Sequence, residues 1–94
     1  MPRVPDRIYR TYIAANVRAL RAKAGLTQEA LAEATGIEPR YLQEVERART
    51  NLSLSVLVGL AEALAVSPTR LLAKAVLAPS KAGRPEKRRR RAVR

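Results

Sequence analysis

Apolar residues recur along the chain with the three- and four-residue spacing of amphipathic helices. The first such run predicts a helix over residues 10–24. Gly25 follows it, where a helix commonly ends on a residue with left-handed backbone angles. The apolar positions of this first helix are Ile13, Val17, Leu20 and Ala24.

Two short helices separated by a glycine turn are predicted next. Thr27 precedes residues 28–35 and can cap them with its hydroxyl, since Thr is a favoured residue at helix N-termini. Gly36 interrupts the pattern, and Pro39, which suits the first turn of a helix, opens a third helix that ends near Arg47. Its apolar positions are Tyr41, Leu42 and Val45.

Two further helices complete the predicted fold, which is all-α. Either Asn51 or Ser53 can cap a fourth helix that ends near Ala65. Ser67 and Pro68 repeat the cap-then-proline signal for a fifth helix, which Pro79 stops. The connections are short, so we expect a compact five-helix domain. The apolar positions of these two helices are Val56, Leu57, Leu60, Ala61, Leu64, Leu71, Leu72, Ala75 and Val76.

The amino-acid composition limits the classes of function that the chain can have. Phe, Trp, Cys and His are absent and only three Tyr are present, so the core must be built from Leu, Val, Ile and Ala. Without Cys and His the chain lacks the commonest metal ligands and general bases, and we expect no metal, no cofactor and no catalytic residue. No apolar run approaches the ~18 residues that span a bilayer, and residues 1–10 lack the apolar core of a secretory signal. We expect a cytoplasmic, nucleoid-associated protein.

The net charge of +11 is concentrated at one end of the chain. Residues 1–10 and 11–78 each contribute +2, whereas residues 79–94 carry eight basic residues and Glu86, a net charge of +7. We therefore divide the chain into an N-terminal arm, a folded domain over 11–78 and a basic tail that is disordered when unbound. Such a tail typically binds nucleic acid through phosphates. The expected DNA contacts are Arg84, Lys87, Arg88, Arg89, Arg90 and Arg91, and a solubilising appendage that stays off the DNA is the alternative.

Residues 28–47 have the layout of a DNA-binding helix-turn-helix, in which two helices flank a glycine turn and the second enters the major groove. In this segment and its neighbours the sequence resembles the phage-repressor and Cro family of bacterial regulators, also called the xenobiotic-response-element family. The resemblance covers about residues 13–73. It is carried by Arg21, Gly25 to Gln28, Leu31, Ala32, Gly36, Ile37, Tyr41, Leu42, Glu46, Arg47, Leu60, Ala61 and Leu64.

The resemblance implies a lambda-repressor-like fold and a sequence-specific DNA-binding regulator, most simply a repressor. It also implies an ion pair between Arg21 and Glu46 that ties the first helix to the third. Three positions depart from the family pattern: Ala48 and Ala65 replace glycines, and Leu52 replaces a proline. All three lie in loops or at helix ends, so they affect loop geometry rather than the fold.

Base-reading residues are expected on the outer face of the third helix. Arg40 can contact guanine and Gln43 can contact adenine, each with two hydrogen bonds, although an ordinary solvated helix face is the alternative. The predicted base contacts are Glu38, Pro39, Arg40, Gln43 and Glu44. The predicted backbone contacts are Gln28, Arg47, Arg49, Thr50 and Asn51, and the resemblance gives Gln28 the added role of bracing the third helix.

A homodimer on a palindromic operator is the expected assembly, because one such domain reads only a few base pairs of double-stranded DNA. The predicted dimer interface is the apolar surface of the fifth helix, formed by Leu71, Leu72, Val76 and Leu77. Three alternatives remain: an antitoxin whose partner is a protein toxin, a restriction-modification controller protein, and a sequence-tolerant nucleic-acid binder that depends on the tail.

Overall fold

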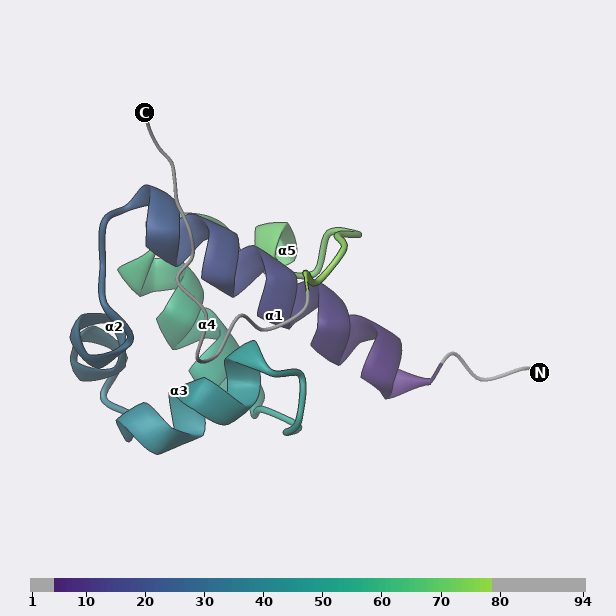
Figure 1. Cartoon of the computed structure of the whole chain (residues 1–94), viewed down its shortest axis with the longest axis horizontal. Coiled ribbons are helices and arrows are strands. Elements are labelled where there is room, and N and C mark those ends of the chain that lie inside the picture. Colours follow the sequence, from purple (N-terminus) through teal and green to yellow (C-terminus); the bar gives the residue numbers. More distant parts are fainter. Residues whose placement is uncertain (1–4, 79–94) are drawn as a thin grey trace, which may run out of the picture.

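Five α-helices make up the structure of residues 5–78, the part of the chain that this computed structural model describes (Figure 1). α1 packs against α3 and α5, α2 packs against α3 and α4, and α4 packs against α5. The prediction of an all-α fold with five helices is confirmed. The helices are α1 (Asp6–Lys23), α2 (Gln28–Thr35), α3 (Pro39–Glu46), α4 (Leu54–Ala63) and α5 (Pro68–Leu71).

A single aliphatic core holds the five helices together. Every helix contributes to it, and its residues are the Leu, Val, Ile and Ala that the composition predicts. Fully burying one such side chain contributes roughly 1.5–3 kcal/mol, so the core is the main source of stability. Its buried members are Ile13, Val17, Leu31, Ala32, Leu42, Val45, Leu57, Leu60, Ala61 and Leu71. Within residues 5–78 no helix is long and apolar enough to cross a membrane.

Side-chain caps begin α2 and α4. The Thr27 hydroxyl accepts a hydrogen bond of 3.0 Å from the backbone N–H of Ala30, as predicted. Ser53 rather than Asn51 caps α4, because its hydroxyl accepts from the backbone N–H of Val56 at 3.1 Å. Each cap satisfies one backbone donor that the first turn of a helix leaves without a partner, and this fixes where the helix starts.

The first helix begins earlier than the apolar pattern predicts. α1 starts at Asp6, so residues 6–10 belong to this helix and not to an N-terminal arm. Pro5 precedes it in an extended conformation, and the Asp6 carboxylate complements the positive end of the helix dipole. The rings of Tyr9 and Tyr12 also meet edge to face, with their centroids 5.4 Å apart, which supports this turn.

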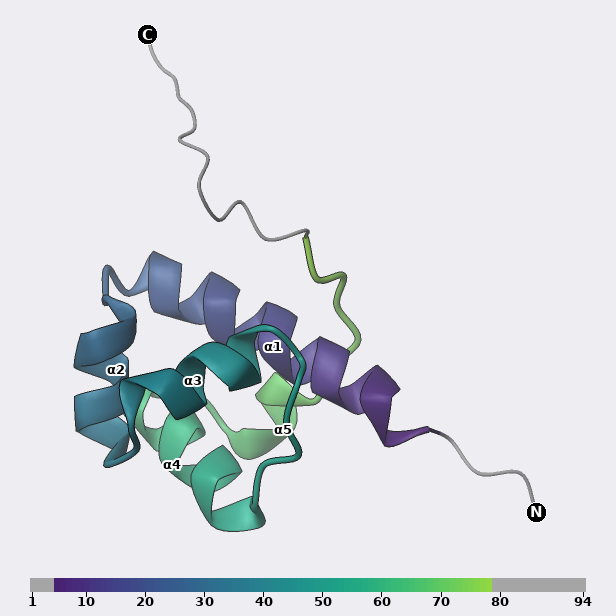
Figure 2. The ribbon, with the colours of Figure 1, turned by 60° about the horizontal axis from the view of Figure 1, so that its bottom comes forward.

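The fifth helix is much shorter than predicted. α5 ends at Leu71, and residues 72–78, which we call the strap, leave it, cross α1 and end on the other side of that helix (Figure 2). The buried amide of Asn16 donates hydrogen bonds to the carbonyls of Leu71 and Ala73, at 2.9 and 2.8 Å. A continued helix would use these two carbonyls as acceptors for its own N–H groups, so Asn16 takes the place of a further helical turn.

α1, α2, α3 and α4 end in the same hydrogen-bonded motif, in which a residue with left-handed backbone angles lies one or two positions after the helix. Gly25 and Gly36 occupy this position with φ of 73° and 80°. Ala48 and Ala65, which replace the glycines of the family pattern, occupy it with φ of 59° and 60°. An alanine in this region costs roughly 1–2 kcal/mol because its Cβ crowds the carbonyl oxygen. The substituted loops thus keep their geometry under strain.

Replacing either alanine by glycine should therefore stabilise the protein. Ala48→Gly and Ala65→Gly each relieve the left-handed strain, and the greater freedom of glycine in the unfolded chain offsets part of that gain. We expect each to raise the free energy of unfolding by about 0.5–1 kcal/mol, measured by urea titration. Ala19→Gly, at an exposed position inside α1, is the matched control and should lower it by about 1 kcal/mol. Losses of similar size at all three positions would contradict the assignment of strain.

Candidate nucleic-acid interface

The outer face of α3 carries the residues predicted to read bases. Its inner face packs Leu42 and Val45 into the core, so the opposite positions are left toward solvent. Arg40 is exposed and Gln43 is half-exposed. α3 lies at the front of the molecule in Figure 2, and no other described helix covers this face there. Glu38 is also exposed, and Pro39 and Glu44 are half-exposed.

Glu46 lies on the inner side of the same helix and joins three helices. Its carboxylate is 3% exposed and accepts two hydrogen bonds from the Arg21 guanidinium, at 2.7 and 3.1 Å. The Gln28 amide donates a third, at 3.0 Å. Arg21 also donates to the Leu26 carbonyl at 2.9 Å, so it ties the loop after α1 to the same group. The predicted ion pair is confirmed, and Gln28 braces α3 directly.

A polar hollow of about 290 Å³ opens beside this cluster. Three guanidinium groups and one carboxylate line it, together with two amide side chains, so its charge favours an anion. The sequence-based prediction missed one member, Arg18, which lies three residues before Arg21 and so shares its side of α1. Those that line the hollow are Arg18, Arg21, Gln28, Gln43, Glu46 and Arg47.

The loop after α3 continues this surface. Arg47, Arg49 and Asn51 are exposed, and Thr50 is half-exposed with its hydroxyl 3.3 Å from the Asn51 carbonyl. The loop is anchored to α3 by the bond from the Arg49 N–H to the Glu44 carbonyl, at 2.9 Å. Four of the five predicted backbone contacts therefore lie directly after α3, and the fifth, Gln28, lies at the start of α2. The predicted tail contacts, Arg84, Lys87 and Arg88 to Arg91, lie outside the described residues.

The predicted dimer interface is partly wrong. Leu71 is 0% exposed and belongs to the core of its own chain, because α5 ends there and packs against α1 and α4. Leu72 packs against the same core, and Leu77 is half-buried. Only Val76, which is 91% exposed, presents a wholly free apolar side chain among the four. The large apolar surface expected of a longer fifth helix is thus absent from the described residues.

No group of three or more His, Cys, Asp or Glu side chains that could hold a metal ion occurs in the described part of the chain. What the site offers is hydrogen-bond donors and positive charge around a braced helix, which is the chemistry of a binding surface.

Comparison with known proteins places the same residues in a family. The model of the helix-turn-helix family HTH_3 matches residues 17–71. The control protein C.SmaI of Serratia marcescens is 44% identical over 62 residues, which are 66% of this chain and 74% of that protein. An uncharacterized HTH-type transcriptional regulator, y4dJ, of Sinorhizobium fredii is 38% identical over 63 residues, 67% of this chain and 82% of that protein.

Solved structures share the fold. The hypothetical transcription factor NHTF from Neisseria aligns with a TM-score of 0.69 and 36% identity, over 79% of this chain and 86% of that one. The restriction-modification controller protein C.AhdI from Aeromonas hydrophila aligns with a TM-score of 0.64 and 37% identity, over 66% of this chain and 94% of that one.

The cluster around Glu46 predicts a difference between two arginines of α1. Arg21→Ala leaves the buried carboxylate with the Gln28 amide alone. We expect a loss of about 3 kcal/mol in the free energy of unfolding, the low end of the range for a buried ion pair because Arg21 is partly exposed. Arg10 has a similarly exposed side chain, 27% against 21%, but its guanidinium lies 3.9 Å from an exposed Asp6. Arg10→Ala should therefore cost about 0.5 kcal/mol or less. Equal losses in urea titrations would show that the carboxylate does not depend on Arg21.

Proposed function

We propose, from the premise that the chain belongs to the helix-turn-helix family of phage-repressor and Cro type, that it binds a palindromic operator as a dimer and represses transcription there. The chain is a DNA-binding transcriptional regulator. Its family model covers residues 17–71, more than half of the chain. The palindrome, the dimer and the sign of regulation are the parts that we add.

The exposed face of the braced α3 is the observation that carries the proposal. Arg40 and Gln43 project from a helix whose opposite side is held by the Glu46 carboxylate, so the reading side chains start from a fixed backbone. In the major groove Arg40 would donate two hydrogen bonds to guanine, and Gln43 would pair with adenine. Glu44 would accept from a cytosine amino group, and its charge would disfavour other placements near phosphates. Glu38 and Pro39 complete the base-contacting set at the start of the helix.

Phosphates would hold α3 in register. The polar hollow between α1, α2 and α3 offers Arg18 and Arg47, and Gln28 retains a second amide hydrogen after it donates to Glu46. Arg49, Thr50 and Asn51 would contact the neighbouring backbone from the loop after α3. Such contacts position a protein on DNA without reading its sequence, whereas base contacts provide specificity. The role is binding rather than catalysis, carried out at the nucleoid in the cytoplasm.

A restriction-modification controller is the second candidate function. Two of the compared proteins, C.SmaI and C.AhdI, are named as a control protein and a restriction-modification controller protein. In their aligned regions C.SmaI is 44% and C.AhdI 37% identical to this chain, and the alignment covers 94% of C.AhdI. These names favour a controller over an antitoxin with a protein toxin as partner. Restriction and methyltransferase genes beside the gene for this chain would support the controller role.

The reading face makes a specific mutational prediction. Selection from a random duplex library would first supply the operator. Arg40→Ala and Gln43→Ala should each weaken operator binding by about 1–3 kcal/mol and relax the preference at particular base pairs. Arg49→Ala is the matched control, because loss of a phosphate contact should weaken binding to all sequences alike. Unchanged affinity and preference in both α3 variants would mean that α3 does not read the operator.

The assembly can be tested separately. We expect sedimentation to show a homodimer at high micromolar concentration, with recognition helices about 34 Å apart on DNA. Val76→Asp, at the 91% exposed position of the strap, should weaken the dimer if the predicted interface residues Leu72, Val76 and Leu77 meet their symmetry mates. A monomer both with and without operator DNA would exclude the dimer. A dimer insensitive to Val76→Asp would exclude this interface.

A further inference from the structure

The strap is clamped to α1 at its beginning. Asn16, 5% exposed, donates to the carbonyls of Leu71 and Ala73 and accepts from the Arg70 guanidinium at 2.9 Å. Both amide hydrogens and the amide oxygen are thus used. A buried amide satisfied in this way holds its partners firmly, because separating them would leave polar groups unpaired away from water.

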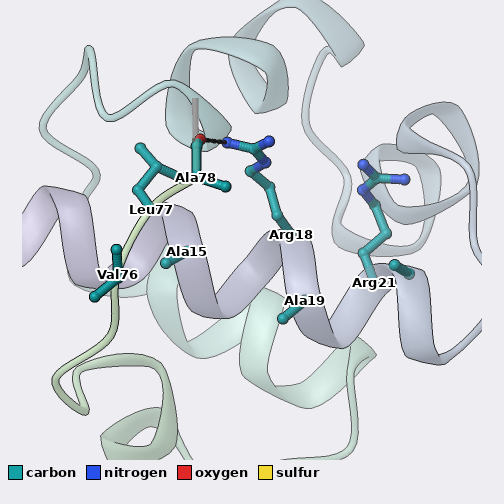
Figure 3. A pocket seen from close by; sticks show the side chains of 8 residues that line it. Ala15, Arg18, Ala19, Arg21, Val76, Leu77 and Ala78 are labelled. Carbon is teal, nitrogen blue, oxygen red and sulfur yellow. Dashed lines mark hydrogen bonds between the residues drawn. The ribbon is translucent and has the colours of Figure 1, made fainter. Parts of the chain in front are cut away.

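The strap is held again at its far end. The Arg18 guanidinium donates to the Ala78 carbonyl at 3.0 Å, and Leu77 is half-buried in a groove of about 390 Å³ along α1 (Figure 3). Val76 between them is 91% exposed. Residues 72–78 belong to no helix or strand. The N–H groups of Leu72 and Ala73 still bond the last turn of α5, and the path of the remaining residues depends on these contacts with α1.

The end of the strap lies beside the polar hollow. Arg18 bonds the Ala78 carbonyl and also lines that hollow with Gln43 and Arg47. The Arg18 side chain thus connects Ala78, the last residue of the strap, to the polar hollow that is proposed to bind phosphates. Residues 79–94 follow, with a net charge of +7 over 16 residues and a maximum reach of roughly 55 Å. One turn of DNA is about 34 Å long, so phosphates flanking the site are within this reach.

We propose that the strap is a positioning device that delivers the basic segment 79–94 to the DNA backbone beside the site bound by α3. The partner is the phosphate backbone of double-stranded DNA, and Asn16 and Leu77 are positioning residues that act through this segment. The proposal rests on the proposed function, since it requires that the face containing the hollow meets DNA. It adds that α1 determines where the charge of the C-terminal segment is placed.

Holding the strap on α1 should raise the effective concentration of the basic segment near the DNA phosphates. With the strap held, the basic segment starts at Ala78. With the strap released, the tether starts at Leu71, on the α5 side of α1, and lengthens from 16 to 23 residues. Effective concentration falls with about the −3/2 power of tether length, and a shifted origin lowers it further. We expect release to weaken binding by about two- to fivefold.

A cycle of four proteins tests the proposal: the full chain, Asn16→Ala, a chain ending at Ala78, and the chain that combines both changes. The probe is a fluorescein-labelled random-sequence duplex of about 30 base pairs, measured by anisotropy across a salt series. The truncation should weaken binding and flatten the log–log salt slope by several units, about 0.9 for each lost phosphate contact. Asn16→Ala should weaken binding two- to fivefold in the full chain and have no effect in the truncated chain.

The outcomes separate the hypotheses. Equal losses in the full and truncated chains would overturn the proposal, because they would show that Asn16 acts only on the fold. A truncation that leaves affinity and salt slope unchanged would also overturn it, while leaving the reading face of α3 intact. Failure of the full chain to bind any duplex, or its operator, would instead remove the proposed function.

A second pair of variants covers the case in which Asn16→Ala does not fold. Leu77→Ser removes the half-buried contact with α1, and Ala73→Ser, at an exposed strap position outside the predicted dimer interface, is its matched control, because it keeps the backbone carbonyl that Asn16 binds. Leu77→Ser should weaken binding of the full chain only, and Ala73→Ser should weaken it in neither chain. Indistinguishable effects of the two substitutions would overturn the proposal independently of Asn16.

Discussion

The buried carboxylate of Glu46 is the interaction on which the presentation of α3 depends. A charge removed from water has to be matched by donors, and here the donors come from α1 and α2. The aliphatic core would tolerate small rotations of α3, because hydrophobic contact is non-directional. A carboxylate with three donors at fixed positions tolerates them much less. The electrostatic pairing on the inner side of α3 thus determines the direction in which Arg40 and Gln43 face solvent.

Most of the fold could be predicted from local sequence because it is determined locally. The Thr27 hydroxyl, the prolines at helix starts and the glycine between α2 and α3 act on their own neighbours, and the structure places them as predicted. For α4 the structure selects Ser53 from the two predicted caps. The end of α5 could not be predicted in this way. Asn16, 55 residues away from Leu71, takes the carbonyl that a longer helix would need. The available signal was a polar residue beside Val17 and three residues after Ile13, on the apolar side of α1.

The same contrast between local and long-range determination applies to the candidate site. Exposure of Arg40 follows from helical periodicity once Leu42 and Val45 are assigned to the core, so the outer face of α3 was predictable. The sequence places Leu71 equally well in a dimer interface and in the core, because an apolar stripe does not tell whether its own chain or a second copy covers it. Arg18 was missed because its place beside the hollow depends on how α1, α2 and α3 pack together.

Apart from the half-buried Leu77 side chain, the strap is held through its main chain. Asn16 and Arg18 bind the carbonyl oxygens of Leu71, Ala73 and Ala78, which every amino acid supplies. Most of the strap can therefore vary in sequence while its path across α1 is kept. The strap can therefore be held on α1 whatever the sequence of the segment that follows Ala78. Substitution, recombination or protein engineering can exchange the C-terminal segment for one of different charge or length, with no redesign of the helix-turn-helix.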